Sequence, residues 1–288
     1  MNILITGGGG FLGSQIAREL QNRRELAPSG GIPVRLEKII VADVAFGPKA
    51  RDEFGPNVSF MKGDIGRAGF AASLMRSDPA IVFHLAAMVS GDGERDFDGC
   101  LRTNLDGTRH LLEACRKRAT CPTVVFASSL AVFGGPGMPA IVSDQTKALP
   151  QTTYGATKLI AELLINDYSR KGFIDGRAAR LPTVFIRPGR PNAAASSFAS
   201  SLFREPLNGE TCFLPVPRSQ AVPLLGYRRV VQNLIRLAQC AAAELGSDRT
   251  VTMPSTRYEI SAMIASLTNI AESRGIQLGP IIDQPDPR

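Results

Sequence analysis

The amino-acid sequence predicts an α/β fold, in which a doubly wound parallel sheet carries a smaller C-terminal portion. Short apolar runs alternate with helical patterns over the first two-thirds of the 288 residues, and a glycine-rich turn separates the first run from the first helical pattern. Beyond residue 186 the chain becomes rich in proline, serine and small residues. We therefore expect one domain over 1–186 and a second, less regular portion over 187–288.

The strands of the first domain are predicted from nearly continuous, β-branched apolar runs. Such runs are typical of parallel strands that are buried on both faces. They fall at 2–6, 38–43, 58–64, 80–86 and 123–128.

Helices are predicted between these strands from apolar residues that recur every three or four positions. They fall at 11–23, 98–116, 154–172 and 230–246, and Gly246 is the expected end of the last one. The helix over 230–246 is a candidate to pack back on the first domain. The segments 187–198 and 213–223 are expected to be loops around a short helix. Alternating strands and helices predict right-handed crossovers and a Rossmann-type sheet.

Composition excludes several classes of protein. Hydrophobic residues make up 44% of the chain and charged residues 20%, which is typical of a globular protein. The first apolar run is too short for a signal peptide, and no segment reaches the roughly 18–20 apolar residues of a membrane span. We expect a cytoplasmic protein with no membrane partner.

Charged residues, cysteines and histidines give little sign of nucleic-acid or metal binding. The net charge is +7 and the tightest basic run, at 116–118, is read as a solvated helix end, so no nucleic-acid partner is expected. Five cysteines without a C-x-x-C pair, together with only His84 and His110, predict no metal site.

The first turn has the chemistry of a dinucleotide-binding loop. Gly7, Gly10 and Gly13 have the spacing G-x-x-G-x-x-G between a strand and a helix. Glycines allow a tight turn and a close approach of the backbone to a pyrophosphate, and the helix N-terminus offers N–H groups to it. This context predicts a bound dinucleotide.

Two carboxylates at strand ends bear on which dinucleotide binds. Asp43 ends the second predicted strand, where it can accept hydrogen bonds from ribose hydroxyls and would repel the extra phosphate of NADP. Asp64 follows the third strand and is a candidate to reach the adenine. NAD is the expected cofactor, while Lys49 and Arg51 near Asp43 keep NADP open.

Tyr154 and Lys158 lie four residues apart at the start of a predicted helix, so their side chains share a face. A lysine ammonium beside a phenol is expected to lower the tyrosine pKa and to make it a general base. Ser128 and Ser129 follow a strand and emerge at the carboxyl edge of the sheet, where ligands bind. A serine hydroxyl there can hold a substrate oxygen.

This order of motifs resembles the extended short-chain dehydrogenase/reductase family, also called the NAD-dependent epimerase/dehydratase family. The resemblance covers most of the chain and rests on T-G-x-x-G-x-x-G (6–13), "DI" (64–65), "HLAA" (84–87), "TNLDGT" (103–108), "SSLAVFG" (128–134), "YGATK" (154–158) and "RPG" (187–189). It implies that Ser129, Tyr154 and Lys158 are catalytic. Tyr154 would then remove the hydroxyl proton of a substrate held by Ser129, while Lys158 holds the nicotinamide ribose. The resemblance implies a cofactor site made of Gly7, Gly10, Phe11, Leu12, Gly13, Asp43, Asp64, Ile65, Leu85, Ala86, Ala87, Asn104, Tyr154, Lys158 and Pro188. Phe133 departs from the tyrosine found in many members.

A closer likeness to sugar-acid dehydrogenases of this family rests on segments 86–98, 180–210 and 215–218. It implies NAD-linked oxidation of the 2-hydroxyl of a four-carbon acid, from D-erythronate to 2-dehydro-D-erythronate. Members usually continue past the point at which this chain stops. Their dimers pair two helices across a two-fold axis, which implies a homodimer through 98–116 and 154–171. From sequence alone, the same helices could equally cover the sheet within one subunit.

A substrate carboxylate in a partly buried site needs a cation or several donors. The candidates are Arg187, Arg190 and Arg228, and spacing does not choose among them. Further substrate contacts are expected from Ser90, Ser129, Tyr154, Asn192 and Ser197.

Two other functions compete with this interpretation. A nucleotide-sugar epimerase or dehydratase would share the cofactor half but needs a larger pocket than segment 186–228 suggests. A cofactor-binding sensor would keep the glycine turn and lose the tyrosine, so the intact Ser129, Tyr154 and Lys158 favour an enzyme.

Overall fold

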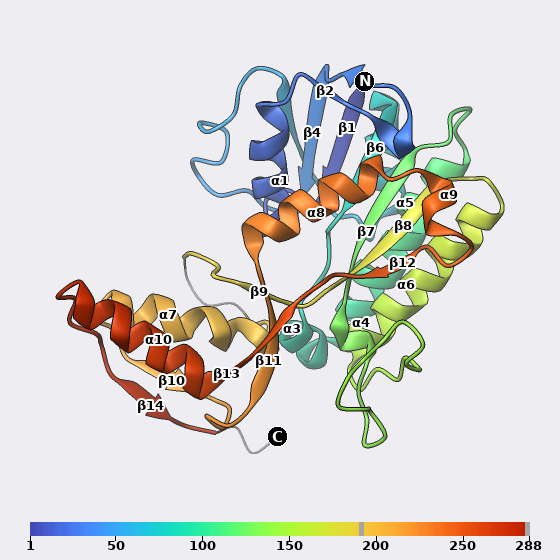
Figure 1. The fold of residues 1–288 in the computed structure, drawn as a ribbon. Coiled ribbons are helices and arrows are strands. Elements are labelled where there is room, and N and C mark those ends of the chain that lie inside the picture. Colours follow the sequence, from blue (N-terminus) through green and yellow to red (C-terminus); the bar gives the residue numbers. More distant parts are fainter. Residues whose placement is uncertain (190–192, 286–288) are drawn as a thin grey trace. The chain divides into compact units, whose positions relative to one another are not determined.

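The protein, seen here as a computed structural model, is described over residues 1–189 and 193–285 (Figure 1). It divides into two compact units. The first consists of Met1–Leu181 with Val231–Met253, and the second of Pro182–Val230 with Pro254–Arg288. The chain thus leaves the first unit just before the boundary expected after residue 186 and returns to it later. The assignment of NAD binding to 1–186 and mainly of substrate binding to 187–288 stays a prediction.

The first unit is built on a seven-stranded parallel sheet with the strand order β12-β8-β7-β6-β1-β4-β5. The strands are β1 (Asn2–Thr6), β4 (Lys38–Asp43), β5 (Val58–Lys62), β6 (Pro79–His84), β7 (Thr123–Ser129), β8 (Asp175–Leu181) and β12 (Thr250–Thr252). The strand order reverses at β1, which has β6 on one side and β4 on the other. The predicted doubly wound sheet and its five predicted strands are therefore confirmed, and ligands of such sheets bind at this reversal.

Helices cover both faces of this sheet (Figure 1). The helices of the first unit are α1 (Phe11–Gln21), α2 (Ala68–Leu74), α3 (Ser90–Arg95), α4 (Phe97–Cys100), α5 (Gly107–Arg116), α6 (Thr153–Arg170), α8 (Tyr227–Gln239), whose first residues belong to the second unit, and α9 (Ala242–Leu245). Alternate strand residues such as Leu4, Ile40 and Val124 share one apolar core with α2, α5 and α6. Within the described residues, no helix has both the length and the apolar character needed to cross a membrane.

Two predicted helices are built differently from the expectation. The helix over 98–116 is helical throughout, but a π-helical segment, Leu101–Asp106, separates α4 from α5. The single helix expected over 230–246 is wrong, because α8 ends at Gln239 and Ala241 is extended before α9. The reason is Arg177 on β8, whose Nη1 donates to the carbonyl oxygens of Leu237, Ala238 and Cys240 and satisfies the helix end there.

The second unit has its own small core, in which Leu202, Leu214, Leu224 and Met263 are buried. A three-stranded sheet pairs β11 (Ala221–Gly226) with β9 (Thr183–Phe185) and β13 (Thr256–Glu259), and β10 (Cys212–Leu214) pairs with β14 (Ile281–Asp283). The helices are α7 (Phe198–Leu207) and α10 (Ile260–Ser273). The loop expected over 213–223 is thus partly wrong, because its ends belong to β10 and β11. A separate short hairpin, β2 (Glu25–Leu26) with β3 (Val34–Arg35), belongs to the first unit.

Candidate active site

The glycine turn between β1 and α1 is packed against the end of β6. A Cβ atom at Gly7, where φ is +70°, would lie 2.6 Å from the backbone nitrogen of Ala86. A Cβ atom at Gly13 would lie 2.3 Å from the carbonyl oxygen of Gly7. Only glycine fits either position. The turn is therefore a tight backbone cradle at the start of α1, with Phe11 and Leu12 in its first turn, as a pyrophosphate requires.

The end of β4 is tied to this cradle. Oδ2 of Asp43 accepts a hydrogen bond of 2.9 Å from the backbone N–H of Gly9, and Oδ1 accepts one of 3.4 Å from Ala45. After β5, Asp64 accepts a hydrogen bond of 2.8 Å from Gly66, and Ile65 is buried beside it. The structure thus brings both carboxylates to the carboxyl edge of the sheet.

Asn104 fixes the segment that follows β6. Its Oδ1 accepts from the backbone N–H of Met88 at 2.7 Å, and its Nδ2 donates to the Met88 carbonyl oxygen at 3.1 Å. The same Nδ2 lies 3.3 Å from Cys100 Sγ and 3.4 Å from Thr157 Oγ1. The buried amide therefore positions Leu85, Ala86 and Ala87 through Met88.

The buried His84, at the end of β6, links β1 to α5. In the sequence it served only as an argument against a metal site. Thr108 donates to the Asn104 carbonyl oxygen at 2.6 Å, so Nε2 of His84 donates to the Thr108 hydroxyl at 2.9 Å. Nδ1 then accepts from the Thr6 hydroxyl at 2.6 Å. Burial, with a smaller effect of the Lys158 charge, lowers the His84 pKa to about 3. This histidine is therefore neutral and structural.

The three predicted catalytic side chains converge at the end of β7. Thr152 caps α6 by accepting from the Gly155 N–H at 3.0 Å, which places Tyr154 and Lys158 on the first turns of the helix. The Ser129 side chain lies beside the Tyr154 hydroxyl, close enough to affect its pKa. Nζ of the buried Lys158 lies 5.5 Å from the centre of the Tyr154 ring. The structure therefore confirms that the two residues share a helix face.

The pKa of Tyr154 differs from the sequence expectation. Burial raises it, the Ser129 side chain lowers it, and the nearby Cys100 raises it further. Burial lowers the pKa of Lys158 to about 8, against the charges of Cys100 and Glu162, which raise it. The expected lowering of the Tyr154 pKa by Lys158 is therefore wrong for the protein chain, because burial raises this pKa.

The predicted substrate residues divide between the two units. Ser90 begins α3 in the first unit, whereas Pro188, Ser197 and Arg228 belong to the second. Arg190 and Asn192 lie outside the described residues. Arg228 is exposed, and its guanidinium lies 5.9 Å from the ring centre of Tyr227.

Arg187 is the more enclosed of the two described arginine candidates. Its backbone N–H donates to Ser200 Oγ at 3.0 Å, and its carbonyl oxygen accepts from Arg204 Nη1 at 2.9 Å. Burial and the charge of Arg204 lower the Arg187 pKa. Arg204 is itself paired with Glu205, and the half-buried Arg187 guanidinium beside it is a candidate partner for an anion.

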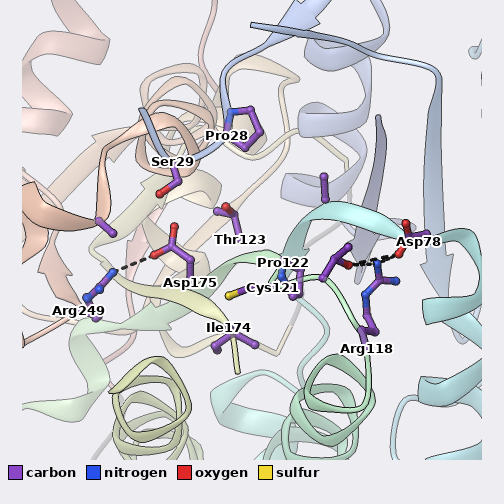
Figure 2. Close-up of a pocket in the computed structure, with 13 residues that line it drawn as sticks. Pro28, Ser29, Asp78, Arg118, Cys121, Pro122, Thr123, Ile174, Asp175 and Arg249 are labelled. Carbon is purple, nitrogen blue, oxygen red and sulfur yellow. Dashed lines mark hydrogen bonds and ion pairs between the residues drawn. The ribbon is translucent and has the colours of Figure 1, made fainter. Parts of the chain in front are cut away.

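A cavity of about 500 Å³ lies at the opposite edge of the sheet (Figure 2). It is lined by residues that begin β7 and β8, such as Thr123 and Asp175, and Asp175 pairs with Arg249 at 2.9 Å. Thr123 and Ser129 are the two ends of β7, so the cavity lies on the order of 20 Å from the tyrosine. It is not the place of the tyrosine chemistry.

The described residues contain no cluster of three or more histidine, cysteine, aspartate or glutamate side chains that could hold a metal ion.

The model of the NAD dependent epimerase/dehydratase family matches residues 3–246, so the chain belongs to this family. It is 45% identical over 271 residues to a D-erythronate dehydrogenase of Cupriavidus necator. The match covers 94% of this chain and 82% of the relative. A D-erythronate dehydrogenase of Haemophilus influenzae is 40% identical over 94% of this chain and 82% of its own.

Among solved structures, the chain resembles one described as a nucleoside-diphosphate-sugar epimerase from Agrobacterium tumefaciens. The TM-score is 0.87 and the identity 39%, over 99% of this chain and 82% of that one.

Proposed function

We propose that the chain is an NAD-dependent dehydrogenase that oxidises the 2-hydroxyl of a four-carbon sugar acid, from D-erythronate to 2-dehydro-D-erythronate. The observation that carries the proposal is the convergence of Ser129, Tyr154 and Lys158 at a strand end of a sheet whose first turn is a glycine cradle. The 45% identity to a D-erythronate dehydrogenase supports the choice of substrate.

The residues of the cradle fit a dinucleotide. Gly7 and Gly13 leave room that any Cβ atom would fill, and α1 begins directly behind them. We assign the pyrophosphate to this helix start and the adenosine ribose to Asp43, with Asp64 and Ile65 nearer the adenine and Pro188 nearer the nicotinamide. When bound, NAD supplies the acceptor for hydride from the substrate carbon.

Tyr154 removes the proton of the substrate hydroxyl, which is held between Tyr154 and Ser129. To act as this base, Tyr154 must first lose its own proton. The resulting phenolate is negative, and the Lys158 ammonium stabilises its charge. Burial opposes the phenolate, so Lys158 must stay protonated for the base to form near neutral pH. General-base assistance of this kind contributes roughly 10²–10⁴ in rate.

Arg187 is the proposed partner of the substrate carboxylate among the described arginines. It is half-buried and lies beside Arg204, whereas Arg228 is exposed and stacked on Tyr227. Ser90 and Ser197, with Arg190 and Asn192, stay predicted substrate contacts.

We also propose a homodimer in which α5 and α6 pair with the same helices of a second copy. Ile160 and Leu163 on α6 are 41% and 62% exposed, although the helix packs on the sheet through Ala161 and Ile165. Apolar side chains on the outer face of this helix support an interface. The cytoplasmic location stays a prediction.

The test is to mix the purified protein with NAD and D-erythronate and to follow NADH formation. UDP-galactose, scored for epimerisation, is the competing substrate, because the Agrobacterium structure is described as a nucleoside-diphosphate-sugar epimerase. We expect NADH from the acid alone. The Tyr154→Phe variant should turn over about 10²–10⁴-fold more slowly while it still binds NAD. Conversion of the nucleotide sugar without oxidation of the acid would overturn the proposed substrate.

A further inference from the structure

Three residues of α6 make contact with the last three residues of β7, one with each. The α6 residues are spaced by four and therefore lie on one helix face. The pairs are Tyr154 with Ser129, Lys158 with the carbonyl oxygen of Ala127 at 2.7 Å, and Glu162 with the hydroxyl of Ser128. The first two pairs belong to the proposed catalytic site, and the third has had no role so far.

The third pair is completed by an arginine from the neighbouring strand. Arg180 on β8 is paired in register with Ser128 on β7. Its Nε and Nη2 donate to the two oxygens of Glu162 at 3.0 Å and 2.7 Å. Its guanidinium lies 4.8 Å from the centre of the Phe133 ring, which fixes its plane.

This ion pair is buried behind the catalytic residues. The side chain of Glu162 is 2% exposed and that of Arg180 12% exposed. Both carboxylate oxygens have donors, so the buried charge is paired and hydrogen bonded. A bidentate pair of this kind fixes orientation as well as distance. It therefore fixes how α6 lies along the end of β7.

We propose that Glu162 and Arg180 are positioning residues of the active site. Their ion pair holds α6 in register with β7, so that Tyr154 meets Ser129, and the Glu162 carboxylate keeps Lys158 as an ammonium. The inference rests on the proposed function for its catalytic meaning.

The surroundings of Lys158 support the electrostatic part. The ionisable groups around it are Tyr154 and Glu162 on the same helix, Cys100 from α4 and His84 from β6, which is neutral. Burial lowers the Lys158 pKa to about 8, and the charges of Cys100 and Glu162 oppose this. Glu162, which is paired with Arg180, is the carboxylate among these neighbours. Without it, Lys158 loses its proton at lower pH.

Glu162→Gln tests the inference, because the amide oxygen can still accept from Ser128 while the charge is lost. The ionisation of Lys158 is followed by nuclear magnetic resonance of [¹³Cε]lysine, with Lys158→Met to assign the signal. This measurement needs no substrate. The dependence of kcat on pH is measured with NAD and D-erythronate beside it.

We expect the Lys158 titration and the high-pH fall of kcat to move together to lower pH, with KM for NAD unchanged. Each unit of displacement cuts kcat about tenfold at pH values above both midpoints. Glu162→Gln together with Arg180→Met removes the arginine left unpaired by the single change, and it should displace both midpoints in the same direction by a smaller amount, because a positive charge is lost with the negative one.

Arg249→Gln is the matched control, because Arg249 pairs with Asp175 at the other end of β8. It should lower the melting temperature and leave both pH midpoints in place. A folded Glu162→Gln protein with the wild-type Lys158 midpoint would overturn the inference, as would failure of both Glu162 variants to fold, which would show a structural role only. A displaced midpoint in a protein whose wild type does not oxidise D-erythronate would instead reject only the proposed function.

Discussion

Replacing Gly13 by alanine should damage the glycine cradle although it improves the helix. Gly13 is the third residue of α1, where alanine is favoured over glycine by roughly 0.5–1 kcal/mol. The added Cβ atom would lie 2.3 Å from the Gly7 carbonyl oxygen and 2.7 Å from the Gly8 Cα atom. Both neighbours are backbone atoms of the turn, so no side chain can rotate away.

The size of the effect follows from how far the turn must move. Contacts under 3.0 Å are essentially never seen for real Cβ atoms, so 3.0 Å less 2.3 Å requires a shift of at least 0.7 Å. Overpacking of this kind costs about 1–3 kcal/mol, which exceeds the gain in helix propensity. We expect Gly13→Ala to lower the free energy of unfolding by up to about 2 kcal/mol.

Cofactor affinity should fall with the displaced turn. If one hydrogen bond to the pyrophosphate is lost, a cost of about 1.4 kcal/mol weakens NAD binding roughly tenfold. Urea denaturation measures the stability, and titration calorimetry measures the dissociation constant of NAD.

Gly69→Ala is the matched control for this variant. Gly69 also lies in the first turn of a helix, α2, and a Cβ atom there has no neighbour within 4 Å. It should be neutral or stabilising and leave NAD binding unchanged. The argument for the cradle would be refuted if Gly13→Ala gained as much stability as Gly69→Ala and bound NAD with wild-type affinity.

The remaining predictions concern pH, substrate and assembly. His84 has a folded pKa of about 3, below its unfolded value of 6.5, so the unfolded chain takes up a proton between these values. Its contribution to stability is therefore complete above pH 6.5 and falls by about 2 kcal/mol from pH 7 to 5. Urea denaturation should show that His84→Gln loses less of its free energy of unfolding than the wild type over this range. An equal loss would contradict the argument. Arg187→Ala should raise KM for D-erythronate about 10-fold or more with KM for NAD unchanged, and Arg187→Lys should raise it less; an unchanged KM would place the carboxylate elsewhere. Leu163→Glu should convert the proposed dimer into a monomer, measured by light scattering, and a wild-type mass would move the interface away from α6.

The sequence predicted the first unit well where each strand is purely apolar. Runs such as 38–43 and 123–128 are buried on both faces, so burial alone marks them. β8 was missed because its segment, "DGRAARL", contains two arginines. Their burial depends on partners far along the chain, on α8 for one and on α6 for the other. No local pattern carries that information.

The predicted site shows the same division. Tyr154 and Lys158 were found because a spacing of four residues on one helix has a direct chemical meaning, and Glu162 continues that spacing. The tyrosine pKa was misjudged because the sequence shows a neighbouring charge but not burial. The sequence assigned His84 no structural role, since its hydrogen bonds are made with Thr6 and Thr108 on other elements.

The two arginines of β8 show how position along one strand decides what a buried charge does. Arg177 lies near the amino end, where its guanidinium donates to three carbonyl oxygens at the end of α8 and pairs with Asp175. It therefore stabilises the fold. Arg180 lies three residues further on, and an odd separation turns it to the opposite face, where α6 packs. There it meets Glu162, one helical turn beyond Lys158. The same residue type thus ends a helix at one edge of the sheet and, by the inference above, positions a base at the other.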